Sequence, residues 1–317
     1  MRIGLMIGPE PRRYRAKVAR LVADATAAEA AGLASIWVPQ IPSDFDALTA
    51  ITLMGAATSR IELGTAVVPI QTRHPIAMAQ QVLTNQAVCE GRFTLGLGPS
   101  HHWIVHDMLG LPYERPAHQM RAYLEVLTVA LAGPGPVDVE NDAWRVHNPL
   151  DITDITPTPI LLAALAPVML RLAGEQTSGT ILWMADERAI EHHVVPRITR
   201  AAADAGRPAP RVVAGVPVVV CAAHEVDAAR QWTNQVLGHA EYSPNYQRLL
   251  EHGDARDVGD VLAAGDEEAV AARLARFRDA GVTDLAVRVV PFGTSRDARL
   301  QSRERTLAFI ASLAGSL

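Results

Sequence analysis

The sequence contains few of the residues on which several common chemistries depend. Its two cysteines, Cys89 and Cys221, lie far apart and form no CxxC pair, so neither a disulfide framework nor a thiolate metal site is expected. The single lysine, Lys17, falls on a predicted helix, which argues against Schiff-base chemistry. There is no GxSxG elbow and no pair of carboxylates at the predicted strand ends, so serine and glycoside hydrolysis are both unsupported.

Charge and hydropathy argue against two further classes of partner. The 317 residues carry a formal net charge of −5, which is too mild to indicate binding to nucleic acid or to an acidic membrane surface. No apolar stretch reaches the length that crosses a membrane, and the N-terminal run is shorter than a signal peptide. We therefore expect a cytoplasmic protein with reduced, buried thiols and a small molecule as its partner.

Eight apolar runs alternate with segments of helical period along the chain. The predicted strands are residues 2–7, 35–38, 61–68, 93–98, 160–165, 180–184, 211–221 and 284–290. Such continuous apolar strands are typical of sheets buried on both faces, and strict alternation implies right-handed crossovers between parallel strands. Eight units predict an α/β fold of the (β/α)8 TIM-barrel type, with an open doubly wound sheet as the alternative. We expect one domain over residues 1–317, with rim insertions at about 134–158 and 224–264.

The mouth of such a barrel, at the carboxyl ends of the strands, is where catalytic residues are expected. Few residues at these positions are charged, so the predicted mouth is apolar and poor in cations, and difficult chemistry there would need a cofactor. Gln40 and His101 are polar exceptions, after the second and fourth strands. A neutral His101 could donate a proton or a hydrogen bond to a substrate; a hydrogen-bonded structural histidine is the alternative.

Three histidines lie close together in the sequence after the fourth strand. His101, His102 and His106, with Asp107 beside them, match neither an HExxH pattern nor a facial triad. No metal site is therefore expected.

Two other sets of titratable residues fall within predicted helices. His192 and His193 lie in the middle of the helix predicted for residues 187–205, and Glu29 lies near the end of the helix predicted for residues 15–31. We interpret all three as solvent-facing side chains.

Two turns carry backbone features of interest. Residues 96–101 contain Gly-x-Gly without the third glycine of a dinucleotide fingerprint. These glycines either ease a tight strand end or let a flat ring approach the backbone. In residues 165–169, a proline at the first helical position leaves backbone N–H groups available to an anion. This second turn predicts a phosphate site, with a plain helix start as the alternative.

Taken together, five stretches resemble the luciferase-like monooxygenase superfamily, and within it the coenzyme F420-dependent oxidoreductases. They are LGTAVVP (63–69), RHP (73–75), GRFTLGLG (91–98), PILLAA (159–164) and GTILWM (179–184). The order and spacing of these stretches carry the resemblance, which runs from the first strand to about Gly293.

The resemblance implies a TIM barrel that binds F420, a 5-deazaflavin, at its mouth. It further implies a bulge in the third strand with a non-proline cis peptide at Ala66–Val67, behind the ring. His101 aligns with an acid of the family, and Gln40 replaces an Asp-His pair that several relatives carry. Those two residues are the expected catalytic ones. The expected cofactor-binding residues are Thr65, Ala66, Val67, Val68, Gly98, Pro99, Ser100, Ala164, Leu165, Ala166, Pro167, Val168 and Trp183.

The function implied by the resemblance is hydride transfer between C5 of the deazaflavin and a small, largely apolar organic substrate of the enone, imine or alcohol type. An FMN-dependent luciferase-like monooxygenase is the first alternative, and a non-catalytic flavin-binding barrel is the second. Because relatives of this kind are often dimers, a homodimer is expected. Neither nucleic acid nor a membrane is expected as a partner.

Overall fold

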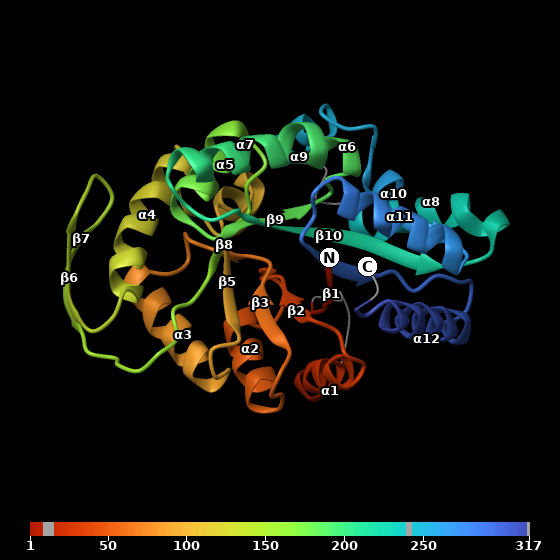
Figure 1. Ribbon diagram of the computed structural model, residues 1–317, viewed down its shortest axis with the longest axis horizontal. Coiled ribbons are helices and arrows are strands. Elements are labelled where there is room, and N and C mark those ends of the chain that lie inside the picture. The colour runs from red at the N-terminus through yellow and green to blue at the C-terminus, as the bar shows by residue number, and fades with distance from the viewer. Residues whose placement is uncertain (9–15, 239–242, 316–317) are drawn as a thin grey trace.

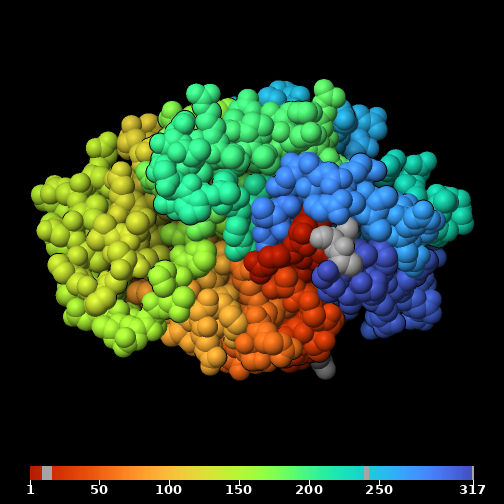
Figure 2. All heavy atoms as spheres, in the orientation of Figure 1, coloured from red at the N-terminus to blue at the C-terminus, as the bar shows by residue number. Residues whose placement is uncertain are grey.

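The computed structural model describes residues 1–8, 16–238 and 243–315, and its centre is a closed ring of eight parallel strands (Figure 1). The ring runs in the order β1, β2, β3, β5, β8, β9, β10, β12 and back to β1. The N-terminal and C-terminal parts of the chain consequently lie side by side (Figure 2). The strands are β1 (Arg2–Met6), β2 (Ser35–Val38), β3 (Glu62–Thr65), β5 (Phe93–Gly98), β8 (Ile160–Leu162), β9 (Gly179–Trp183), β10 (Arg211–Val220) and β12 (Asp284–Val289). The predicted TIM barrel is confirmed, and the open sheet is excluded.

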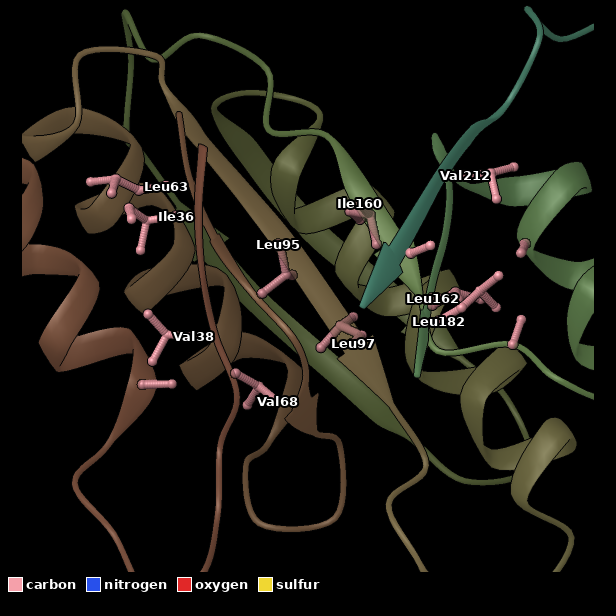
Figure 3. Close-up of a cluster of buried hydrophobic side chains, with 14 of the residues drawn as sticks. Ile36, Val38, Leu63, Val68, Leu95, Leu97, Ile160, Leu162, Leu182 and Val212 are labelled. Carbon is pink, nitrogen blue, oxygen red and sulfur yellow. The ribbon is translucent and has the colours of Figure 1, made fainter. Parts of the chain in front are cut away.

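Helices surround this ring and cover its outer face (Figure 1). They are α1 (Lys17–Ala30), α2 (Ala47–Ala56), α3 (Pro75–Val88), α4 (Pro116–Leu131), α5 (Pro167–Gln176), α7 (Val195–Asp204), α11 (Glu267–Asp279) and α12 (Arg296–Ser312). Successive residues of a strand face opposite sides. Leu95, Leu97 and Leu162 therefore pack outward in the large core between strands and helices (Figure 3). A smaller core fills the barrel, made of Met6, Trp37, Leu161, Ile181, Val213 and Ala286.

The helix predicted for residues 187–205 is interrupted. It is divided into α6 (Glu187–Ala189), a π-helical turn at Ile190–Val194 and α7. Pro196 has no N–H, and its ring would clash with the carbonyl of residue 192 in a regular helix. In place of the missing backbone hydrogen bond, the Arg197 guanidinium donates to the carbonyls of His192 (3.4 Å) and His193 (2.8 Å).

Two segments stand apart from the repeating βα units. The first is an antiparallel hairpin of β6 (Gly135–Glu140) and β7 (Arg145–Leu150), which extends beside α4 at one end of the molecule (Figure 1). Its Trp144 packs edge-on against the rings of His74 and Tyr123. The second follows β10 and contains η3 (Ala223–Glu225), α8 (Val226–Leu237), α9 (Pro244–Leu250), α10 (Val258–Val261) and β11 (Ala263–Gly265). A hairpin and a helical segment thus occupy the regions where rim insertions were expected, and residues 239–242 of the second region lie outside the described residues.

The amino-terminal end of the barrel is closed by ionic contacts instead of apolar ones. The Arg211 guanidinium donates to Glu62 (2.8 Å) and to Asp284 (2.8 Å). Burial opposes ionisation of Glu62, but its contacts with Arg211, Arg2 and Thr94 together outweigh burial and lower the pKa of this carboxyl. Cys89 and Cys221 are free and buried, as predicted, and burial raises the pKa of both thiols.

Glu29 is not the ordinary surface charge expected from the sequence. Its carboxylate accepts hydrogen bonds from the backbone N–H groups of Ser59 (2.9 Å), Arg60 (2.6 Å) and Ile61 (2.9 Å). Burial alone would raise the pKa of Glu29, but these hydrogen bonds lower it to about 2. The Glu29 carboxylate, on α1, therefore fixes the turn that leads into β3.

We predict that Glu29→Gln lowers the free energy of unfolding at neutral pH. The folded-state pKa lies below the ordinary value of 4.5, so the contribution is complete above about pH 4.5 and is lost as the pH falls towards 2. Urea unfolding at several pH values should show wild type and variant converging over this range. Glu304→Gln, at an exposed position on α12, is the control, and a difference that is independent of pH would contradict the prediction.

Candidate active site

The mouth of the barrel is formed by inward-facing residues at the carboxyl ends of the strands. Ala66, Val67 and Trp183 pack onto the inner core, and each is partly exposed above it. Beside them, an added Cβ on Gly98 would lie 3.2 Å from the Ala163 Cβ. The floor around Ala66–Val67 is therefore built from small side chains, with the Trp183 indole as the large exception.

One positive charge at the mouth was missed by the sequence analysis. Arg288 falls on the same side of β12 as Asp284 and Ala286, by the two-residue alternation of a strand. Its guanidinium contacts the carbonyl of Met6 at the end of β1 (3.4 Å). The mouth is less poor in cations than predicted, and the alternation of β12 was the signal that could have identified Arg288.

The third strand is broken at the mouth, and a side chain repairs the break. β3 pairs with β5 at Gly64 and Thr94, and β4 (Val68–Pro69) resumes the pairing at Val68 and Leu97. Between them the Thr65 hydroxyl accepts from the Gly96 N–H (2.9 Å) and donates to the Gly96 carbonyl (2.9 Å). The Ala66–Val67 peptide bond is cis. The predicted bulge and its cis bond are confirmed.

This bulge explains the glycines of β5. A Cβ on Gly96 would lie 1.9 Å from the Thr65 carbonyl oxygen, and one on Gly98 would lie 2.5 Å from Val67 Cγ2. Both distances are far below van der Waals contact. Of the two interpretations of this Gly-x-Gly, tight packing at the strand end is therefore sufficient, because the close neighbour is the bulge of the protein itself.

The loop after β5 is clamped from two sides. The Gln71 side chain donates to the Pro99 carbonyl (2.8 Å), and the Tyr113 hydroxyl donates to the Ser100 carbonyl (3.1 Å). Ser100 has a positive φ of 57°. Gln71 and Tyr113 are positioning residues that the sequence analysis missed, and they fix the backbone from which His101 projects.

His101 lies in an aromatic environment. Its ring is stacked on Trp103 (centroids 6.0 Å apart) and lies 5.6 Å from the ring of Tyr246, on α9. Burial lowers the pKa of His101, so the imidazole is neutral at pH 7. The indole Nε1 of Trp103 is buried, and it has no hydrogen-bond partner within the described ranges. The site thus brings His101 together with two aromatic side chains.

The turn after β8 has the backbone that the phosphate prediction requires. Pro167 and Val168 are exposed at the start of α5, and Ala166 supplies no side-chain cap. The first N–H groups of an α-helix have no partner within the helix, and together with the helix dipole they favour an anion. The predicted phosphate site therefore has a suitable donor set.

His193 contradicts the expectation that the pair 192–193 is solvated. His192 is exposed, but His193 is buried, with 2% of its surface accessible. Its Nε2 contacts the Leu165 carbonyl (2.7 Å), and its ring stacks on His252 (centroids 3.9 Å apart). Burial is the main cause that lowers the pKa of His193. Its neutral ring supports the turn from behind, a contact between distant residues that no local pattern signals.

Three residues that the sequence predicted for the site have side chains that are poorly placed to contact a cofactor or substrate. Val68 and Ala164 are fully buried in the outer core, on the helix side of the strands (Val68 in Figure 3). Only their backbones remain to contact a cofactor. The Gln40 side-chain oxygen accepts from the Ala47 N–H at the start of α2 (2.8 Å), so a catalytic role for Gln40 would rest on its NH2 group and stays a prediction.

One further cluster and two cavities lie away from His101 and the Ala66–Val67 floor, although Arg288 and Met6 line the first cavity. His102, His106 and Asp107 are exposed, with ligand atoms within 4.8 Å of one another, and the expectation that they bind no metal stays a prediction. A cavity of about 280 Å³ lies between α1, β1, β12 and α12, and a polar hollow of about 630 Å³ lies at α6 and α11. Within the described part of the chain, no helix is both long and apolar enough to span a membrane.

The parallel barrel and the cis peptide bond in its broken third strand are the two structural features that the resemblance implied. Residues 1–284 match the family model described as luciferase-like monooxygenase. The chain belongs to this family.

Known proteins of two cofactor types are similar to the chain. The 5,10-methylenetetrahydromethanopterin reductase of Methanopyrus kandleri is 24% identical over 333 residues, covering 90% of this chain and 92% of the relative. An F420-dependent secondary alcohol dehydrogenase aligns with a TM-score of 0.76 at 16% identity, covering 98% of each chain. The FMN-bound oxygenating component of 3,6-diketocamphane monooxygenase from Pseudomonas putida aligns with a TM-score of 0.74 at 16% identity, covering 100% of this chain and 98% of that one. These two structures support the fold.

We predict that Thr65→Val destabilises the protein by roughly 2–4 kcal/mol, because the nearly isosteric change leaves the buried N–H and carbonyl of Gly96 without partners. Urea unfolding measures the change. Thr84→Val, at an exposed position on α3, should cost less than about 0.5 kcal/mol. Equal effects of the two substitutions would show that the Thr65 hydroxyl is not needed at the break.

Proposed function

We propose that the protein is a coenzyme F420-dependent oxidoreductase that transfers a hydride between the deazaflavin and a small, largely apolar organic substrate. The observation that carries the proposal is the pairing of a small-residue floor at Ala66–Val67 with an uncapped helix start at Pro167–Val168. The floor fits one face of a planar ring, and the helix start fits a phosphate on its side chain. F420 offers both groups.

The bound cofactor would supply hydride chemistry at C5 of its ring, and the residues of the chain would bind, orient and exclude water. Ala66 and Val67 would support the ring from below, and the backbone of residues 98–100 would border it. The N–H groups at the start of α5 would hold the phosphate. Holding both reactants in one geometry lowers the barrier chiefly by removing the entropic cost of their encounter.

His101 is the residue proposed to act on the substrate. Its neutral imidazole carries one N–H donor and one acceptor nitrogen, and it lies beside the expected ring position on the loop after β5. It can hold a polar atom of the substrate and exchange a proton with it. The apolar surroundings at Trp103 and Trp183 favour a substrate of the enone, imine or alcohol type.

FMN is the alternative cofactor, because flavin-dependent monooxygenases share the fold and the FMN-bound neighbour is as similar as the F420-dependent one. We predict that purified protein quenches the fluorescence of F420 on titration and binds it more tightly than FMN. Tight binding of FMN with no binding of F420 would reject the proposal in favour of the monooxygenase. Binding of both with no turnover on a broad substrate panel would favour a non-catalytic barrel.

The proposed phosphate site allows a sharper test. We predict that Val168→Asp weakens F420 binding by about tenfold, because a carboxylate at the helix start repels the phosphate. The same carboxylate is favourable to the helix dipole, so folding should be preserved. Val18→Asp makes the same change in the first turn of α1 and should leave F420 affinity unchanged. Equal F420 affinity in Val168→Asp and wild type would place the phosphate elsewhere.

A homodimer is part of this proposal. The chain has exposed apolar side chains on several helices, including Leu53 on α2, Val129 on α4 and Leu300 on α12. Single exposed apolar side chains are also normal on monomers, so the proposal of a dimer rests on the resemblance to a family whose members are often dimers. Light scattering on the purified protein would give the mass, and a single mass near 34.1 kDa would exclude the dimer.

A further inference from the structure

The segment that follows β10 brings one tyrosine to the candidate site. Tyr246 lies on α9, and its ring is 5.6 Å from the ring of His101 with the planes tilted by 39°. The two residues are 145 positions apart in the sequence. In Figure 1, α9 lies beside α6 and α7, over the part of the barrel that ends in β9. The helical insertion therefore contributes a wall to the mouth.

This wall is held in place from the barrel side. The carboxylate of Asp186, which follows β9, accepts from the N–H groups of Asp254 (2.6 Å) and Ala255 (2.7 Å), beyond the end of α9. The stacked ring of His252 fixes the same segment onto His193. A Cβ on Gly253 would lie 2.3 Å from the Asp186 carboxylate, so the segment passes as close to Asp186 as a backbone can. These contacts fix α9, and Tyr246 with it.

The polar atoms of the Tyr246–His101 pair remain available. Among the described residues, neither the Tyr246 hydroxyl nor the His101 ring nitrogens make a hydrogen bond, and both rings are partly accessible. Burial raises the pKa of Tyr246 well above its usual range, so the hydroxyl stays protonated at all working pH values. The Tyr246 ring is thus partly accessible, and its surroundings oppose ionisation of the hydroxyl.

We propose that Tyr246 is a second substrate-contacting residue, whose hydroxyl donates a hydrogen bond to an oxygen of the substrate that His101 also contacts. The inference rests on the proposed function and narrows its substrate class to compounds with a carbonyl or hydroxyl oxygen. Two neighbouring donors that share one oxygen of the substrate select for that oxygen, because a substrate without it leaves both donors unpaired. An unsubstituted hydrocarbon or a plain imine is then a poor ligand.

Ligand-observed NMR on the purified protein tests this inference without turnover. The probes are 2-cyclohexen-1-one and, as its counterpart without oxygen, cyclohexene. We expect Tyr246→Phe to weaken binding of the enone by about threefold to tenfold, the worth of one neutral hydrogen bond, with cyclohexene binding unchanged. Gln247→Ala, an exposed neighbour on the same helix, should leave both affinities unchanged.

Several outcomes would overturn the inference. Equal enone affinity in Tyr246→Phe and wild type would show that the proposed hydrogen bond does not form. A parallel loss of affinity for both probes would show that Tyr246 contributes only apolar contact. Failure of the wild type to bind the enone would reject the substrate class. F420 titration of the same variant separates the two proposals: retained F420 binding with unchanged enone affinity sinks only the inference, whereas no F420 binding by wild type sinks the proposed function.

Discussion

The exchange of hydrogen bonds between the Thr65 hydroxyl and the backbone of Gly96 is the constraint on which the mouth depends. In a parallel barrel an interrupted strand leaves its neighbour with an unpaired N–H and carbonyl, and each is costly when buried. One hydroxyl satisfies both groups here. The chain can therefore leave the ladder at Ala66 and Val67 and rejoin β5 at Val68 without leaving the N–H and carbonyl of Gly96 unpaired.

The same break determines on which side of the sheet the residues around it pack. Leu63 and Val68 both pack in the outer core although they are five positions apart, which requires one residue more than the alternation of a regular strand. Residues 61–68 were predicted as one continuous strand because both faces of this strand are apolar, so the change of face leaves no mark in the hydropathy pattern. The cis peptide bond was expected only from the resemblance to a known family. Thr65 was predicted as a contact of the cofactor, but its two hydrogen bonds with the backbone of Gly96 were not predicted.

What the sequence predicted well is local or repetitive. The strand at residues 93–98 was predicted to the residue, because an apolar run that ends before Pro99 defines it. What it missed depends on contacts between distant parts of the chain. His193 lies in a polar stretch that is typical of the solvated side of a helix. It is buried because it contacts distant residues, among them the Leu165 carbonyl. Tyr246 lies in a segment without strong periodicity, so nothing local connects it with His101.

These distant contacts join the two sides of the mouth. His193 holds the Leu165 carbonyl in the turn that would bind the phosphate, and its ring stacks on His252, just beyond the helix that carries Tyr246. A single pair of rings thus links the proposed cofactor cradle to the proposed substrate wall. The eight barrel strands close without this contact. The proposed cofactor site at β3, β5 and the turn after β8 and the proposed substrate wall on α9 thus come from different parts of the chain.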